Sequence, residues 1–166
     1  LLTPTFLTAA DIKAVFETTA AAQRVTYVIY LINAATSATT MGSYITNYAA
    51  LLGLSLADYN LLTAAGKTAV QTALIAPTFV TADEVKTAFD TAVAVQRINE
   101  APASAIGAIL TTNASILGLD LTDYTILLYK DSVHNTLATP TFTDSASAKQ
   151  LLMPPLRRRK RQNHRF

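Results

Sequence analysis

The chain has 166 residues, of which 51% are hydrophobic and only 14% are charged, against about a quarter charged in an ordinary globular protein. So much apolar surface excludes a disordered, charge-solvated chain, because burying it can offset the entropy of ordering. The sequence contains no cysteine, which excludes disulfide scaffolds, thiol nucleophiles and Cys-ligated zinc.

Two long segments of the sequence resemble each other. Residues 7–24 match residues 80–97 at a constant offset of 73, and residues 53–59 match residues 118–124 at an offset of 65. The tripeptide Pro-Thr-Phe occurs at 4–6, 77–79 and 140–142, and its first two copies directly precede the segments 7–24 and 80–97. Self-similarity of this kind predicts tandem structural units. The predicted units are residues 4–76, a shortened second unit over 77–139, and the start of a third at 140–149.

The first helix of each unit is predicted to begin at a capping box, in which a threonine oxygen and an acidic side chain satisfy exposed amide groups. Apolar residues spaced i,i+4 follow and are expected to lie on one buried stripe. The capping boxes are Thr8 with Asp11 and Thr81 with Glu84, and the apolar pairs are Ile12 with Phe16 and Val85 with Phe89.

The two units differ by a deletion within this first helix. In the first unit, residues 25–31 (VTYVIYL) separate Arg24 from Ile32, whereas in the second Arg97 is followed directly by Ile98. Seven residues are almost two helical turns, so the deletion roughly preserves which face points inward. The pattern therefore predicts a helix that continues through this point.

Two further helices are predicted in each unit. The second is expected to stop at a glycine in the left-handed conformation. The third is expected to restart at two polar residues spaced i,i+3 and to end before the next Pro-Thr-Phe, since proline cannot continue a preceding helix. These residues are Gly53, Ser55, Asp58 and Ile75 in the first unit, and Gly118, Asp120, Asp123 and Leu137 in the second. The predicted fold is all-α, with two tandem three-helix repeats in a helical array.

Few side chains in the sequence suit catalysis. His134 aligns with Gln71, and a position that accepts glutamine is predicted to be an exposed helical position. The recurring Asp-Tyr pairs at 58–59 and 123–124 are interpreted as an acid near a helix start and a tyrosine packed with its hydroxyl at the rim. No phosphate-binding glycine loop, Ser-His-Asp order, HExxH or EF-hand pattern occurs. We therefore predict no catalytic residue, no metal site, no cofactor and no enzymatic activity.

Four tyrosines of the first unit allow two interpretations. They could pack in the core and along an extended interface between units, or they could form an aromatic contact patch for a protein or glycan partner. These residues are Tyr27, Tyr30, Tyr44 and Tyr48.

The C-terminal residues differ in composition from the rest of the chain. The formal net charge is +2, yet residues 1–149 have a balance of −4, and residues 150–166 carry six bases and no acid. This tail is expected to be disordered. Its interpretation is open between polyanion or nucleic-acid binding, anchoring to an anionic surface, and a reading-frame or gene-fragment artefact, which would also explain the start at Leu1. The candidate polyanion-binding residues are Arg157, Arg158, Arg159, Lys160, Arg161 and Arg165.

Three segments carry a resemblance to a known type of repeat: INAAT at 32–36, LGLSLADYN at 52–60, and TAAGKTAVQTAL at 63–74 followed by TADEVKTAFDTAVA. They are similar to the Ala/Thr-rich helical repeats that occur in tandem in large bacterial cell-surface and S-layer-associated proteins. The resemblance covers residues 4–149 and implies an extracellular spacer or adhesin-like segment without catalytic residues, whose partners are neighbouring repeats. No apolar run approaches the roughly 20 residues of a spanning helix, so no membrane span is predicted.

Overall fold

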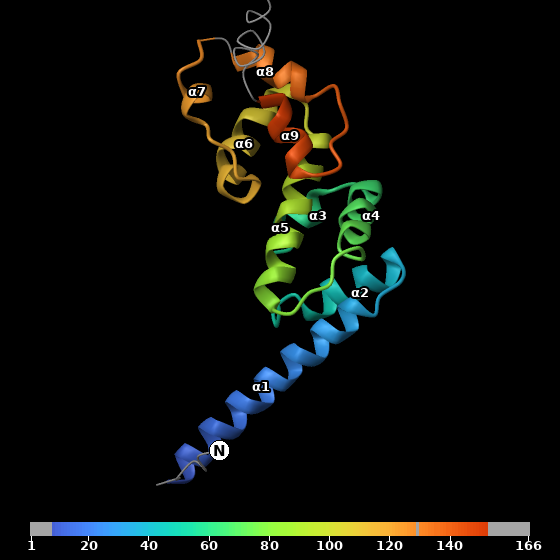
Figure 1. Cartoon of the computed structure of the whole chain (residues 1–166), viewed down its shortest axis with the longest axis vertical. Helices are drawn as coiled ribbons and strands as arrows, with labels where there is room; N and C mark the ends of the chain where they lie inside the picture. The colour runs from blue at the N-terminus through green and yellow to red at the C-terminus, as the bar shows by residue number, and fades with distance from the viewer. Residues whose placement is uncertain (1–7, 129, 153–166) are drawn as a thin grey trace, which may run out of the picture.

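The computed structural model describes residues 8–128 and 130–152. Within these two ranges every regular element is a helix and there is no strand, so the predicted all-α class is confirmed (Figure 1). The helices are α1 (Ala9–Asn33), α2 (Ala38–Tyr48), α3 (Ala57–Leu61), α4 (Ala64–Ala73), α5 (Ala82–Asn99), α6 (Ala103–Leu117), α7 (Thr122–Thr125), α8 (Lys130–Leu137) and α9 (Ser145–Leu152).

Two hydrophobic cores meet within a single helix. The first core lies among the C-terminal half of α1, α2, α3, α4 and the N-terminal half of α5. The second lies among the C-terminal half of α5, α6 and α8. Val93 belongs to the first core and the next residue, Ala94, belongs to the second. Figure 1 shows α5 running from the group formed by α2, α3 and α4 into the group formed by α6, α8 and α9.

Helices α1 and α5 differ in length by the number of residues that the sequence predicts. Helix α1 has 25 residues and α5 has 18, and neither is interrupted, so the prediction of a helix through the deletion is confirmed. The buried residues of the C-terminal halves also correspond. Val28, Ile29 and Ile32 face the first core, and Ala94, Val95 and Ile98, all 66 positions later, face the second.

The predicted starts of the long helices α1 and α5 are confirmed. Both capping boxes form, with Thr8 and Asp11 bonded reciprocally at the start of α1 and Thr81 and Glu84 at the start of α5. Asp144 holds the matching position before α9, where its Oδ1 accepts a hydrogen bond from the Ser147 amide at 2.7 Å. This hydrogen bond, together with one from the Ser147 side chain, lowers the pKa of the Asp144 carboxyl.

The left-handed conformation predicted for both glycines is confirmed, but the predicted helix stop is confirmed only at Gly118, which directly follows α6; α2 already ends at Tyr48, five residues before Gly53. Gly53 has φ of +66° and Gly118 has φ of +60°, values that favour glycine because it has no Cβ. In each case the following amide bonds the carbonyl five residues earlier at 2.8 Å, Leu54 to Ala49 and Leu119 to Ala114. This is the hydrogen bond of a Schellman motif.

The prediction of three helices per unit is wrong, because the third helix divides into two. In the first unit Leu62 is extended, and the Thr63 hydroxyl accepts from the Gly66 amide to begin a new helix, α4. In the second unit α7 ends at Thr125 and α8 begins at Lys130. In the first predicted unit, the Thr63 side chain that caps α4 competes with continuation of α3. Each predicted unit therefore contains four helices where three were expected.

The predicted polar starts of the short helices are also wrong. The N-cap residues of α3 and α7 are Leu56 and Leu121, and neither has a side-chain cap. Asp120 instead accepts hydrogen bonds from the hydroxyl and the amide of Thr122, which lower the pKa of its carboxyl.

One tertiary contact that sequence reasoning missed occurs twice. The Asn33 side chain, at the end of α1, donates to the Phe79 carbonyl at 2.8 Å and accepts from the Phe79 amide at 2.9 Å. Asn99, at the end of α5, makes the same two bonds to Phe142, at 2.9 and 2.8 Å. Each asparagine thereby holds a buried phenylalanine of a Pro-Thr-Phe segment against its core.

Replacing Asn99 with alanine is expected to lower the free energy of unfolding by about 1–3 kcal/mol, because two backbone groups of Phe142 lose their partner. The matched control is Asn135→Ala at an exposed position of α8, which is expected to cost under about 0.5 kcal/mol. Urea denaturation followed by circular dichroism measures both. Equal losses in the two variants would contradict a structural role for the Asn99 contact.

Candidate interaction surface

The four candidate tyrosines separate into two pairs. Tyr27 and Tyr30 are 59% and 66% exposed on α1. Tyr44 and Tyr48 lie on α2, with ring centroids 6.3 Å apart, and pack against the first core. The structure therefore does not bring the four together as one patch.

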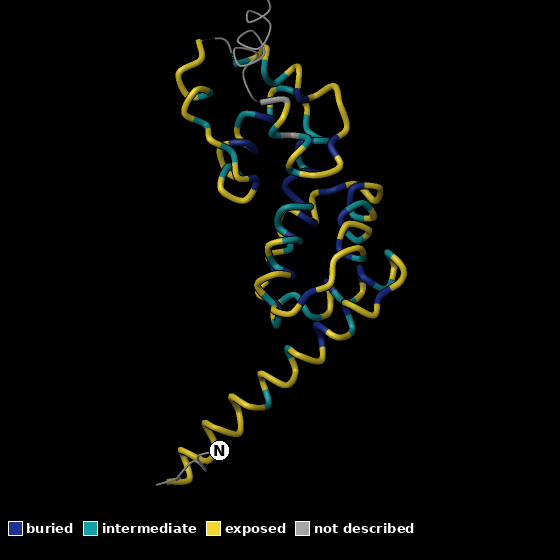
Figure 2. The backbone as a smooth tube through the Cα atoms, viewed as in Figure 1, coloured by how far each residue is buried: buried dark blue, intermediate teal, exposed yellow. Residues whose placement is uncertain are grey.

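Helix α1 carries its apolar residues on two opposite sides. Its C-terminal half packs on the first core, whereas its N-terminal half projects away from the rest of the chain, exposed along most of its length (Figure 2). Ile12 and Phe16 are 55% and 71% exposed, so the prediction that they are buried is wrong. The matching Val85 and Phe89 are fully buried in the first core. Helices α3 and α4, which precede α5 in the sequence, cover the N-terminal half of α5, whereas the described residues include no helix that precedes α1.

Helix α5 is tied to the first unit by polar contacts as well as apolar ones. The Phe89 ring packs 5.6 Å from the Tyr59 ring, measured between centroids. Arg97 Nε lies 3.6 Å from Asp58 Oδ1. The Glu100 carboxylate accepts from the amide and the hydroxyl of Thr63, at the N-terminus of α4, where the helix dipole favours an anion.

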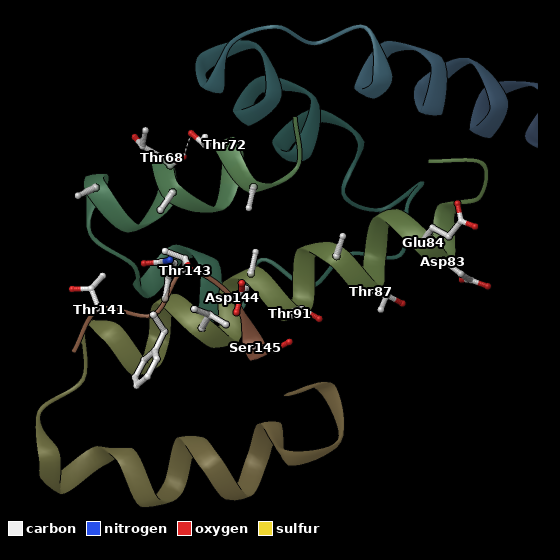
Figure 3. Close-up of a pocket in the computed structure, with 18 residues that line it drawn as sticks. Thr68, Thr72, Asp83, Glu84, Thr87, Thr91, Thr141, Thr143, Asp144 and Ser145 are labelled. Carbon is white, nitrogen blue, oxygen red and sulfur yellow. Dashed lines mark hydrogen bonds between the residues drawn. The ribbon is translucent and has the colours of Figure 1, made fainter. Parts of the chain in front are cut away.

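A groove of about 990 Å³ runs between α4, α5 and residues 141–145 (Figure 3). Its walls are mostly alanine and threonine. The hydroxyls of Thr68 and Thr72 bond carbonyls of their own helix at 2.9 and 2.8 Å, which leaves their methyl groups for the wall. Three acidic residues line it: Glu84 and Asp144 already serve as helix caps, and Asp83 lies in the first turn of α5. The groove is thus lined mainly by small side chains, and two of its three acids are engaged in capping helices.

His134 has a structural partner, and the prediction that it is an exposed position is wrong. Its side chain is 13% exposed, and its Nε2 lies 2.7 Å from the Tyr124 hydroxyl. Partial burial raises the pKa of Tyr124. A Cβ on the facing Gly107 would lie 2.9 Å from the imidazole ring, so this close approach requires glycine.

The first unit repeats this arrangement with Gln71 in place of histidine. The Gln71 amide donates to the Tyr59 hydroxyl at 2.7 Å, and a Cβ on Gly42 would lie 2.5 Å from the same amide nitrogen. Because glutamine and histidine fill equivalent places between a tyrosine and a glycine, the contact needs a hydrogen-bonding side chain of this size and not an imidazole.

The candidate polyanion-binding residues, from Arg157 to Arg165, and His164 lie outside the described residues. Among residues 8–128 and 130–152, no group of three or more His, Asp or Glu side chains is placed to hold a metal ion. None of the described helices is long and apolar enough to cross a membrane.

Comparisons with models of protein families, with curated proteins and with solved structures found no match to this chain.

Proposed function

We propose that this chain is a non-catalytic spacer segment of a bacterial cell-surface protein, built from tandem helical repeats that share their long helices. Its partners are neighbouring repeats of a longer chain, and its exposed helical faces are available to a protein or glycan at the surface. Its mechanism is mechanical, because units that share a helix hold whatever lies beyond them at a defined distance.

The observation that carries this proposal is the position of α5 in both cores. Val85, Phe89 and Val93 pack in the first core, and Ala94, Val95 and Ile98 pack in the second. A continuous helix has no flexible linker at which two units can swing. In arrays of this kind each unit is stabilised by the interface with its neighbour.

Three further features support tandem repeats. Each occurs once in either half of the chain: the asparagine–phenylalanine contact, the left-handed glycine, and the tyrosine contact with Gln71 or His134. The likeness of residues 4–149 to Ala/Thr-rich repeats of bacterial surface proteins supports the location. The non-catalytic assignment draws on cores in which the described buried side chains are all apolar.

The rigidity of the shared helix can be tested by measuring the distance between the two units. The chain has no native cysteine, so Asn60→Cys in α3 and Thr112→Cys in α6, both exposed, provide a specific pair of spin-label sites. We expect electron–electron double resonance to give one narrow distance distribution. A broad distance distribution in this labelled chain, which carries no insertion, would contradict the spacer proposal, because it would show that the two units move independently.

A matched pair of insertions completes this experiment. Two glycines between Val93 and Ala94 interrupt α5 and turn the second core by about 200° relative to the first, so the distribution is expected to broaden. The same two glycines between Thr36 and Ser37, in the loop between α1 and α2, are expected to leave it unchanged.

A further inference from the structure

The outer face of α1, on the side of the helix away from the first core, carries several exposed apolar residues. Its exposed members are Ile12, Val15, Phe16, Tyr27 and Tyr30. At 100° per residue they fall within a sector of about 120°. The residues of α1 that face the core, among them Val28 and Ile32, lie on the opposite side. Thr19, Gln23 and Thr26 separate the two tyrosines from the other three on this face, so Ile12, Val15 and Phe16 form an exposed apolar cluster of their own. Such a cluster marks an interaction site more often than scattered single residues do.

Helix α5 shows what covers such a face. At the offset of 73, Ile12 corresponds to Val85 and Phe16 to Phe89, and both of these α5 residues are fully buried. They pack against α3 and α4 of the preceding unit, where Phe89 meets Tyr59.

The arginine that makes the polar contact of this interface has a counterpart on α1 at the same spacing. Arg97, eight residues after Phe89, pairs with Asp58. Arg24 likewise follows Phe16 by eight residues. The N-terminal half of α1 therefore carries both the apolar and the charged residues with which α5 contacts a preceding unit.

We propose that residues 9–24 of α1 dock onto a preceding helical unit of the same kind in a longer chain. Phe16 packs on the tyrosine equivalent to Tyr59, and Arg24 pairs with the aspartate equivalent to Asp58. The partner is thus a four-helix unit equivalent to residues 25–76. This inference rests on the proposed tandem-repeat function and assigns its interface.

A preceding unit fits this face better than a second copy of the chain. The Tyr59 face of this chain is already covered by α5. The corresponding face of the second unit is contacted by α9, which packs against α8 and α5. The sequence before α1 also carries Pro4, Thr5 and Phe6 at the spacing with which Pro77, Thr78 and Phe79 connect α4 to α5.

The test is a tandem protein in which an additional copy of residues 4–76 is joined directly before Pro4 of the full chain. Amide hydrogen exchange is measured for residues 9–24 in the tandem protein and in the original chain. We expect protection of these residues to rise about 100-fold, because docked helices exchange only through opening of the packed structure. It is expected to approach the protection of residues 82–93 in the same molecule.

Two substitutions in the original α1 of the tandem protein provide the matched control. Phe16→Ser is expected to abolish the added protection. Tyr30→Ser alters an equally exposed residue on the same face, 14 positions further along and beyond the docked segment, and is expected to leave the protection in place.

The results that would overturn the docking proposal are distinct from those against the spacer function. Unchanged exchange of residues 9–24, with the added unit itself folded and protected, overturns the docking alone. Concentration-dependent protection and a dimer mass for the original chain would identify a second copy as the occupant, which also overturns it. Loss of protection throughout the added unit would contradict the tandem-repeat function itself.

Discussion

Replacing Phe89 with alanine is expected to lower the free energy of unfolding by about 3–5 kcal/mol, the usual cost of removing a fully buried aromatic side chain. Phe89 has no exposed surface and packs against Tyr59 in the first core. Urea denaturation monitored by circular dichroism measures the loss. The transition is also expected to become less cooperative, because Phe89 lies on the helix that belongs to both cores.

The chain contains a matched control for this substitution. Phe16 occupies the equivalent position of α1 and is 71% exposed, so Phe16→Ala is expected to change the free energy of unfolding by less than about 0.5 kcal/mol. Comparable losses for Phe16→Ala and Phe89→Ala would mean that α1 already has a partner in solution, for example in a dimer. Measurement across a range of protein concentrations distinguishes that case.

Inserting the seven residues VTYVIYL between Arg97 and Ile98 is expected to lengthen α5 by about 10 Å while keeping both cores folded. The rise of an α-helix is 1.5 Å per residue, and seven residues return nearly to the same face. The insert also places its own valine and isoleucine where Ala94 and Val95 pack, as Val28 and Ile29 do in the first core. The Asn60 and Thr112 spin-label pair measures the change in distance.

This insertion also separates Glu100 from Thr63, so the two hydrogen bonds between them are lost. We expect a cost of about 1–3 kcal/mol from that loss, without loss of the fold. The control is an insertion of only five residues, VTYVI, at the same place. Five residues rotate the following segment by about 140°, so the second core is expected to unfold at markedly lower urea. If both insertions behave alike, the orientation of the two cores does not depend on α5.

Local features of this protein followed from sequence because they depend on neighbouring residues. A threonine followed three positions later by an acid forms the capping boxes at Thr8 and Thr81. The two glycines expected in the left-handed conformation, Gly53 and Gly118, both have positive φ. The seven-residue difference between α1 and α5 followed from the spacing of matched residues. Each of these is decided within one or two helical turns.

Features that depend on distant residues were not predicted. The division of the third helix at Leu62 and Thr63 is accompanied by Glu100, which is 37 residues away and bonds Thr63. The recurrence of Ile-Asn at 32–33 and 98–99 was visible in the sequence, but its role appears only where the asparagine meets a phenylalanine more than 40 residues later. Polarity and spacing along a helix carry no information on such partners.

The sequence by itself determined the all-α class, the starts of α1 and α5, the left-handed glycines and the similarity of the two halves, because these are properties of local spacing and composition. Only the tertiary structure decided which apolar residues are buried. Ile12 and Phe16 have the same helical pattern as Val85 and Phe89, yet the first pair is exposed and the second is buried. Burial requires a partner surface, and in this chain α3 and α4 supply that surface to α5.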